Sequence, residues 1–142
     1  MNIAILGSGG REHALSWKLA QSAPQAQIYA LPGNGGIPNS VLIDSMNFAA
    51  IKQFCREKQI DLVVVGPEAP LVAGIVDEFA GSGVKVFGPT KRAAQLEGSK
   101  IFAKQFMAKY GVATADFWVF EGNDPAAVDR IRELRGAVVI KY

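Results

Sequence analysis

The chain has 142 residues, of which 49% are hydrophobic and 20% charged, an ordinary composition for a soluble globular protein with a core. Its net charge of +2 is too small to favour nucleic acid or an anionic membrane as a partner. A single cysteine, Cys55, excludes an internal disulfide and a cysteine-based zinc cluster. No basic segment precedes the apolar start, and the longest apolar region, residues 62–76, is interrupted by glycine, proline and glutamate. We therefore expect a cytoplasmic protein without a membrane span.

The N-terminal stretch combines a short apolar run with a glycine loop. Residues 1–6 (MNIAIL) are typical of a buried strand, residues 7–13 (GSGGREH) follow directly, and a helical pattern occupies residues 11–22. Such a loop lets a ligand approach the backbone closely, and the free amides of the helix N-terminus favour an anion, most often phosphate. A tight turn with glycines for packing alone would have the same sequence, so the loop by itself leaves both interpretations open.

A dinucleotide site is less favoured by the same loop. The dinucleotide fingerprint has a third glycine where this chain has Glu12, and it places a ribose-binding carboxylate at the end of the second strand. The predicted second strand, residues 27–31, leads instead into Pro32 and the glycine turn 33–36. A NAD-dependent oxidoreductase therefore remains only as a weakened alternative.

Strand and helix patterns alternate through the next seventy or so residues. The first helix is expected to bury an apolar stripe of Ala14, Leu15, Leu19 and Ala20. Further strands are predicted at residues 27–31, 41–43, 61–65 and 84–87. Further helices are predicted to begin at Phe48 and at Pro70, and another to run from residues 88–90 through Glu97. This alternation predicts a parallel sheet with right-handed crossovers, whose ligands bind beyond the carboxyl ends of the strands. Four segments should then share one rim: residues 7–13, 33–36, Glu68 and 88–90.

The pattern changes after Gly98. Ser99 is a good N-cap for a helix that carries Phe102, Phe106 and Tyr110 at a spacing of four residues, and burial habits favour a core role for this aromatic stripe. Strands are predicted at residues 115–120 and 137–142, separated by a helix that begins at Asp124-Pro125. Because the last predicted strand runs to the final residue, we expect residues 1–98 to form one domain and residues 99–142 the incomplete opening of a second.

Four long motifs resemble one family. In this order and spacing, GSGGREHAL, PGNGG, DLVVVGPEAPLVAGIVD and FGPTKRAAQLEGSKIFAKQFM are similar to the N-terminal third of phosphoribosylamine–glycine ligases, which are ATP-grasp enzymes of purine biosynthesis. The resemblance covers nearly all of the chain. It implies an α/β fold in which a Rossmann-like three-layer parallel sheet, the pre-ATP-grasp domain, is followed by the start of an ATP-grasp domain.

The resemblance also implies a reaction. In the family, ATP with Mg²⁺ or Mn²⁺ phosphorylates glycine to a glycyl phosphate, which the amine of 5-phosphoribosylamine attacks to give glycinamide ribonucleotide, ADP and phosphate. The implied partners are these small molecules, with no nucleic acid and no membrane. The oligomeric state is open, with a monomer expected for the complete enzyme.

Site residues follow from the resemblance position by position. For phosphoribosylamine it implies Gly9, Gly10, Arg11, Glu12, Asn34 and Glu68, and for the phosphates of ATP it implies Lys100 and Lys141. An exposed first-turn residue is the structural alternative for Arg11, and a solvated helix residue is the alternative for Lys100. No catalytic or metal-binding residue is assigned, because the family's metal ligands and glycine site lie beyond these motifs.

One departure limits the expected activity. After the second lysine the family continues with an alanine and a glycine-rich loop, whereas this chain has Tyr142. We therefore expect the 142-residue chain alone to be inactive in glycinamide ribonucleotide formation. A stand-alone sugar-phosphate binding module is the main alternative.

Overall fold

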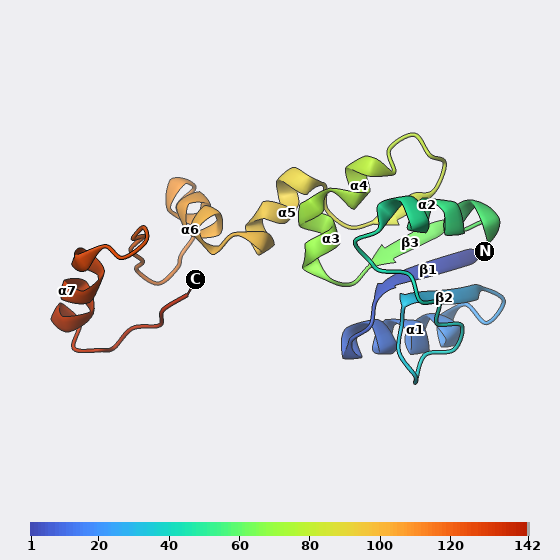
Figure 1. The fold of residues 1–142 in the computed structure, drawn as a ribbon, viewed down its shortest axis with the longest axis horizontal. Coiled ribbons are helices and arrows are strands. Elements are labelled where there is room, and N and C mark those ends of the chain that lie inside the picture. Colours follow the sequence, from blue (N-terminus) through green and yellow to red (C-terminus); the bar gives the residue numbers. More distant parts are fainter. Residues whose placement is uncertain (142) are drawn as a thin grey trace. The chain divides into compact units, whose positions relative to one another are not determined.

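The computed structural model describes residues 1–141, and the chain divides into two compact units with the boundary between Gly98 and Ser99. The first unit holds a parallel sheet whose described strands are β1 (Asn2–Gly7), β2 (Gln27–Pro32), β3 (Leu62–Val65) and β4 (Lys85–Phe87). Their spatial order is β2-β1-β3-β4, and every pairing is parallel (Figure 1). The predicted α/β fold with a parallel sheet is confirmed.

Helices cover both faces of this sheet, so the unit has three layers (Figure 1). On one face, α2 (Phe48–Glu57) and α4 (Ile75–Glu78) contribute to the larger apolar core, in which Leu6 of β1 and Val63 of β3 are fully buried. On the other face, α1 (Gly10–Ser22) covers a smaller core around Ile5 and Val64. Because the inner strands β1 and β3 are buried on both faces, they consist almost entirely of apolar residues.

The face of α1 that meets the sheet is not the predicted one. Glu12 and Ser16 are its buried residues, and Leu19 packs against the smaller core. Ala14, Leu15 and Ala20 of the predicted buried stripe are exposed. Two polar residues at helical spacing therefore occupy positions that an apolar pattern assigns to the core, and one of them, Glu12, lies at the start of the helix.

Two other expectations for the first unit are corrected. Residues 41–43 form no strand, and the segment makes only an isolated bridge from Ser40 to Ala30 before it turns towards α2. The helix predicted from Pro70 is interrupted at Gly74, whose φ of 101° is left-handed, so that α3 (Glu68–Ala73) and α4 are separate. The helix α5 (Lys91–Gly98) packs against α3.

Polar side chains cap the N-termini of several helices, and for Ser99 this confirms the predicted N-cap. The side chain of Asn47 accepts a hydrogen bond from Ala50 N at the start of α2. In the second unit, Ser99 and Asp124 cap α6 (Lys100–Lys109) and α7 (Pro125–Glu133) by accepting bonds from Phe102 N and Ala126 N. None of the helices within residues 1–141 has the length and hydropathy that crossing a membrane requires.

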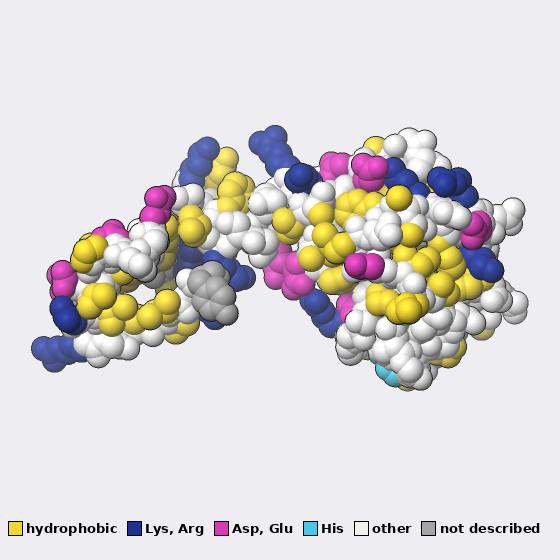
Figure 2. Space-filling model, in the orientation of Figure 1, with side chains coloured by type: hydrophobic (Ala, Val, Ile, Leu, Met, Phe, Trp, Pro, Cys, Tyr) yellow, Lys and Arg dark blue, Asp and Glu magenta, His cyan; other side chains and the backbone are white. Residues whose placement is uncertain are grey.

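The second unit has little of the predicted sheet. Residues 115–120 and 137–141 have no strand structure, and Tyr142 lies outside the described residues. The rings of Phe106 and Tyr110 are in contact, with 4.5 Å between centroids and a 45° tilt, but both side chains and that of Phe102 are exposed. The prediction that this aromatic stripe is core is wrong, because the described part of the unit contains no sheet to cover it. Figure 2 shows apolar side chains at the surface of this unit.

Candidate functional site: the pocket at the carboxyl edge of the sheet

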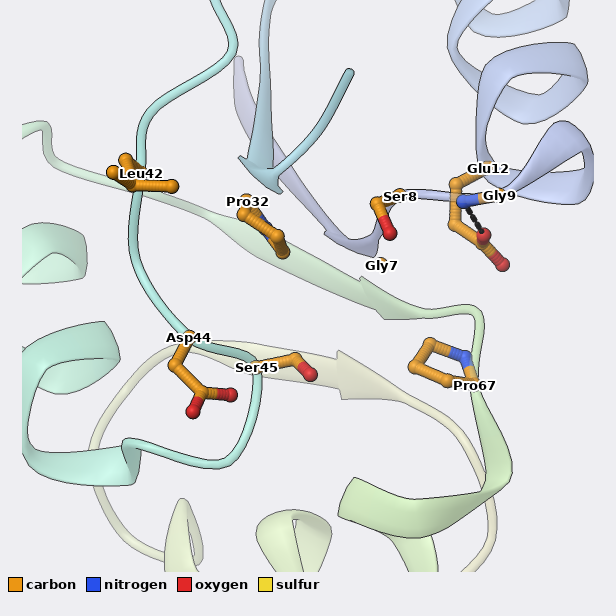
Figure 3. A pocket seen from close by; sticks show the side chains of 9 residues that line it. All are labelled: Gly7, Ser8, Gly9, Glu12, Pro32, Leu42, Asp44, Ser45 and Pro67. Atoms are coloured by element: carbon orange, nitrogen blue, oxygen red, sulfur yellow. Dashed lines mark hydrogen bonds between the residues drawn. The ribbon is translucent and has the colours of Figure 1, made fainter.

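A pocket of about 630 Å³ opens at the carboxyl ends of β1, β2 and β3 (Figure 3). Its lining comes from the glycine loop, the two neighbouring strand ends and the segment before α2: Gly7, Ser8, Gly9, Glu12, Pro32, Leu42, Asp44, Ser45 and Pro67. The chain leaves β1 for β2 on one side and later returns to β3 on the other, so β1 lies at the point where the strand order reverses. Ligands of parallel sheets bind in the crevice at such a point.

The glycine loop delivers a helix N-terminus to this pocket. Gly7 has a φ of 118°, which favours glycine, and Gly9 is the extended N-cap of α1. The first hydrogen bond of the helix runs from His13 N to Gly9 O, at 3.1 Å. The amides of the residues at positions 10 to 12 therefore have no acceptor within the helix. Their N–H groups and the helix dipole give this end of the pocket a partial positive charge.

Glu12 occupies the place where a dinucleotide loop has its third glycine. Its Oε2 accepts a hydrogen bond from Gly9 N at 2.7 Å, and the residue is only 4% exposed. A Cβ added to Gly7, Gly9 or Gly66 would collide with the Glu12 side chain. The three glycines thus make room for one carboxylate, which is hydrogen-bonded to the loop after β1 and packs against Gly66 after β3. The amide of Gly9 is engaged by this carboxylate, and that of Gly10 is the first without a helical acceptor.

Arg11 lies between two carboxylates. Its Nη2 is 3.5 Å from Oε2 of Glu68, and its Nε is 3.9 Å from Oε1 of Glu12. Glu68 is the first residue of α3 and follows Pro67, which lines the pocket. The structure therefore brings together Arg11, Glu12 and Glu68 beside the pocket, although Arg11 and Glu68 are not among its lining residues. Arg11 is two-thirds exposed, so solvent screens both of its ion pairs strongly.

Asn34 links the second turn to the glycine loop. Its Nδ2 donates to Ser8 O at 2.9 Å, and its Oδ1 accepts from Gly36 N at 2.9 Å. The backbone adds a bond from Gly33 N to Gly7 O at 3.1 Å. Both polar atoms of the Asn34 side chain thus have protein partners, and the bond from Nδ2 to Ser8 O holds Ser8 in position at the pocket.

Two polar lining residues, Asp44 and Ser45, were not predicted. Oδ1 of Asp44 accepts a hydrogen bond from Met46 N at 2.9 Å, and its carbonyl accepts one from Asn47 N. Both residues stand in a turn just before the cap of α2, where aspartate and serine are common for local reasons. Only the fold, which bends this segment over the ends of β1 and β2, distinguishes them from ordinary turn residues.

The two lysines expected to contact ATP lie in the second unit. Lys100 is the first residue of α6, Lys141 has no regular secondary structure, and both are exposed. A different lysine in this unit, Lys104, donates from Nζ to Thr114 Oγ1 at 2.6 Å and to Ala115 O at 2.9 Å. Within residues 1–141, no group of three His, Cys, Asp or Glu residues could hold a metal ion.

Comparison with known proteins shows the family of the chain. Residues 1–97 match the family model described as "Phosphoribosylglycinamide synthetase, N domain". The chain belongs to the phosphoribosylglycinamide synthetase family. The site described above therefore lies in the part of this synthetase-family chain that the N-domain model covers.

Relatives of this family include bacterial and animal proteins. The chain is 49% identical to a phosphoribosylamine–glycine ligase of Neisseria meningitidis serogroup B, over 99% of the chain and 34% of that protein. It is 53% identical to the trifunctional purine biosynthetic protein adenosine-3 of Gallus gallus, over 88% of the chain and 13% of that protein. The crystal structure of a phosphoribosylamine–glycine ligase from Thermotoga maritima superimposes with a TM-score of 0.65 and 32% identity, over 94% of this chain and 30% of that one. This family member thus spans about a third of the length of the bacterial relatives that it matches.

Proposed function

We propose that the chain serves in a phosphoribosylamine–glycine ligase and that the pocket of its first unit binds the phosphorylated pentose of 5-phosphoribosylamine. The observation that carries the proposal is the pocket at the reversal of strand order, with unpaired amides of α1 at one end and carboxylates beside it. In this arrangement the amides of Gly10, Arg11 and Glu12 would donate to the phosphate. Glu68 would accept hydrogen bonds from ribose hydroxyls, and Gly9 and Asn34 would keep the loop in shape.

We also propose that two successive parts of the chain belong to different domains. Residues 1–98 would form the sugar-phosphate domain and residues 99–142 the opening segment of an ATP-grasp domain. The division into compact units after Gly98 supports this boundary, as does the match of the N-domain model to residues 1–97. Lys100 and Lys141 would contact ATP phosphates as exposed point charges, which is the manner in which lysine binds phosphate.

ATP with Mg²⁺ or Mn²⁺ would supply the phosphoryl group that activates glycine in the whole ligase. The described residues do not fit a metal site, since residues 1–141 contain no cluster of three carboxylate, imidazole or thiol ligands. No step through the metal is therefore assigned to them. Their part in the reaction is to bind and orient the pentose phosphate that carries the nucleophilic amine.

Calorimetric titration of the 142-residue chain tests this proposal. Ribose 5-phosphate, a stable analogue with a hydroxyl in place of the amine, should bind at one site, and NAD should not bind. The substitution Glu68→Gln should weaken ribose 5-phosphate binding by about tenfold, the effect of losing a charged hydrogen-bond acceptor. Glu57→Gln is the matched control, because Glu57 ends α2 and is bonded to Gln53. Tight NAD binding without ribose 5-phosphate binding would contradict the proposal.

A further inference from the structure

The pocket has a second wall, which faces the glycine loop. It is formed by the segment just before α2, from which Leu42, Asp44 and Ser45 line the pocket. In Figure 3 this segment runs along the side opposite the glycine loop, and the Ser45 hydroxyl extends towards the space in front of Pro67. The pocket therefore has lining side chains on two sides, and none of the site residues implied by the family resemblance lies in residues 42–45.

Hydrogen bonds fix the backbone of this second wall. The carbonyl of Asp44 accepts from Asn47 N at 2.9 Å, and its Oδ1 accepts from Met46 N at 2.9 Å. Asn47 in turn caps α2, and Ile51 of that helix is fully buried in the larger core. A turn that is tied in this way to a packed helix holds its side chains in place before a ligand arrives, which is what a binding group requires.

The hydroxyl of Ser45 has no structural use in the described part of the chain. Serine in a turn before a helix commonly bonds to a nearby backbone N–H. Here Asp44 and Asn47 supply these bonds, and Ser45 Oγ has no hydrogen-bond partner within residues 1–141. The residue is half-buried and lines the pocket, so its hydroxyl is available to donate one hydrogen bond to a ligand and to accept others.

The two walls differ in the groups that they would bind. At the glycine loop, the amides of Gly10 and Arg11 offer partial positive charge for a phosphate. In the second wall, the carboxylate of Asp44 would repel a phosphate, and Leu42, which is 94% exposed, offers an apolar surface to C–H groups. An uncharged sugar suits this combination, because its hydroxyls would bond to Ser45 while its ring carbons pack against Leu42.

We infer that Ser45 is a specificity-determining residue of the pocket: its Oγ hydrogen-bonds to a hydroxyl of the pentose while the phosphate lies at the N-terminus of α1. This inference rests on the proposed function and deepens it, because it names the group that distinguishes a sugar phosphate from phosphate alone. It also sets the direction of the ligand, with the phosphate at the glycine loop and the pentose extending towards residues 42–45.

Three substitutions separate a contact of the hydroxyl from an effect on the turn. Ser45→Ala removes Oγ, and Ser45→Thr keeps a hydroxyl. Ser22→Ala is the matched control, because Ser22 is exposed at the end of α1 and lies outside the pocket. Calorimetry on the 142-residue chain would compare binding of ribose 5-phosphate with binding of inorganic phosphate, and thermal unfolding followed by circular dichroism would verify the fold of each variant.

We expect Ser45→Ala to weaken ribose 5-phosphate binding by about three- to tenfold, the effect of one lost hydrogen bond, and to leave binding of inorganic phosphate unchanged. Ser45→Thr should bind ribose 5-phosphate within about twofold of the unmodified chain. The inference is overturned if Ser45→Ala weakens both ligands equally or neither, or if the alanine and threonine variants lose the same affinity. Absence of ribose 5-phosphate binding by the unmodified chain would instead overturn the proposed function, and the inference with it.

A second measurement needs no substitution and covers the case in which a variant does not fold or inorganic phosphate binds too weakly for calorimetry. Intermolecular nuclear Overhauser effects on the unmodified chain should connect the pentose protons of bound ribose 5-phosphate to the Hβ protons of Ser45 and to the methyl groups of Leu42. Saturation with ribose 5-phosphate without such effects, or pentose contacts confined to the glycine loop, would overturn the inference.

Discussion

The two units of this chain have similar hydrophobic patterns and very different burial. In Met1–Gly98, apolar strands lie between helices, and Leu6, Val63 and Ile75 are fully buried. In the described residues from Ser99 onwards, Ala103 is the one buried hydrophobic residue, and large apolar side chains such as Phe106, Val139 and Ile140 are exposed. The difference shows that apolar residues at a regular spacing form a core only where a sheet is present to cover them.

The site lies in the better packed unit for the same reason. The pocket needs three strand ends and a helix N-terminus at fixed positions, and the sheet supplies them through parallel pairing of β1 with β2 and β3. The exposed lysines of the second unit have no such frame within residues 100–141. A rigid frame of this kind is what holds binding groups in place.

Hydrogen exchange should show the largest contrast between the units. Amides of β1 and β3 are buried and paired, so they should exchange about a thousandfold or more slowly than unstructured amides, as expected for opening that needs global unfolding. Amides of residues 115–120 and 137–141 should exchange almost freely. Slow exchange of the latter in a demonstrated monomer would contradict the comparison.

Truncation of one apolar side chain in each unit should give the next largest difference. Leu6→Ala removes a fully buried side chain from the larger core and should lower the free energy of unfolding by about 2–5 kcal/mol. Phe106→Ala removes an exposed ring and should cost no more than about 1 kcal/mol. Urea unfolding followed by circular dichroism measures both free energies. Equal losses would show that Phe106 is packed in a core as Leu6 is, which would contradict the comparison.

The buried thiol of Cys55 gives the first unit a pH dependence. Burial raises the pKa of Cys55 from its ordinary 9.0 to about 11, since desolvation disfavours the thiolate. The neutral thiol therefore contributes stability that is fully present below pH 9 and is lost as the pH rises towards 11, on the order of 2–3 kcal/mol. The difference in unfolding free energy between the unmodified chain and Cys55→Ala should shrink over that range. A constant difference would contradict the assignment.

A methyl group at Gly66 should weaken ligand binding at the pocket and should lower the free energy of unfolding by less than Leu6→Ala does. Gly66→Ala would push against the carboxylate of Glu12, so we expect a loss of about 1–3 kcal/mol in stability, from overpacking, and weaker ribose 5-phosphate binding. Gly35→Ala is the matched control, because a Cβ there meets nothing within 4 Å. Similar effects of the two substitutions would show that Glu12 does not depend on the space at Gly66.

The sequence predicts most of the sheet and part of the site. Apolar β-branched runs and capping residues locate the strands and helices of the first unit, because local pattern and burial agree there. The same reasoning fails at Glu12, since no pattern indicates that a glutamate will be buried beneath glycines that lie far apart in the chain. It also fails at Asp44 and Ser45, whose position at the pocket depends on how a loop crosses two strand ends.

Residues 115–120 and 137–141 show the opposite failure. Their composition favours strands, but a strand needs a partner, and the described part of the second unit offers none. Strand propensity measures how well side chains fit a half-buried surface, so it predicts little where that surface is missing.

The most direct test of the pocket is an amide ¹H–¹⁵N titration of the 142-residue chain with ribose 5-phosphate. The amides of Gly10, Arg11 and Glu12 should show the largest shifts, with smaller ones at Ser45, and residues of the second unit should remain unmoved. Absence of any saturable shift at these three amides, or shifts confined to residues after Ser99, would contradict the claim that the carboxyl edge of the sheet binds a phosphorylated pentose.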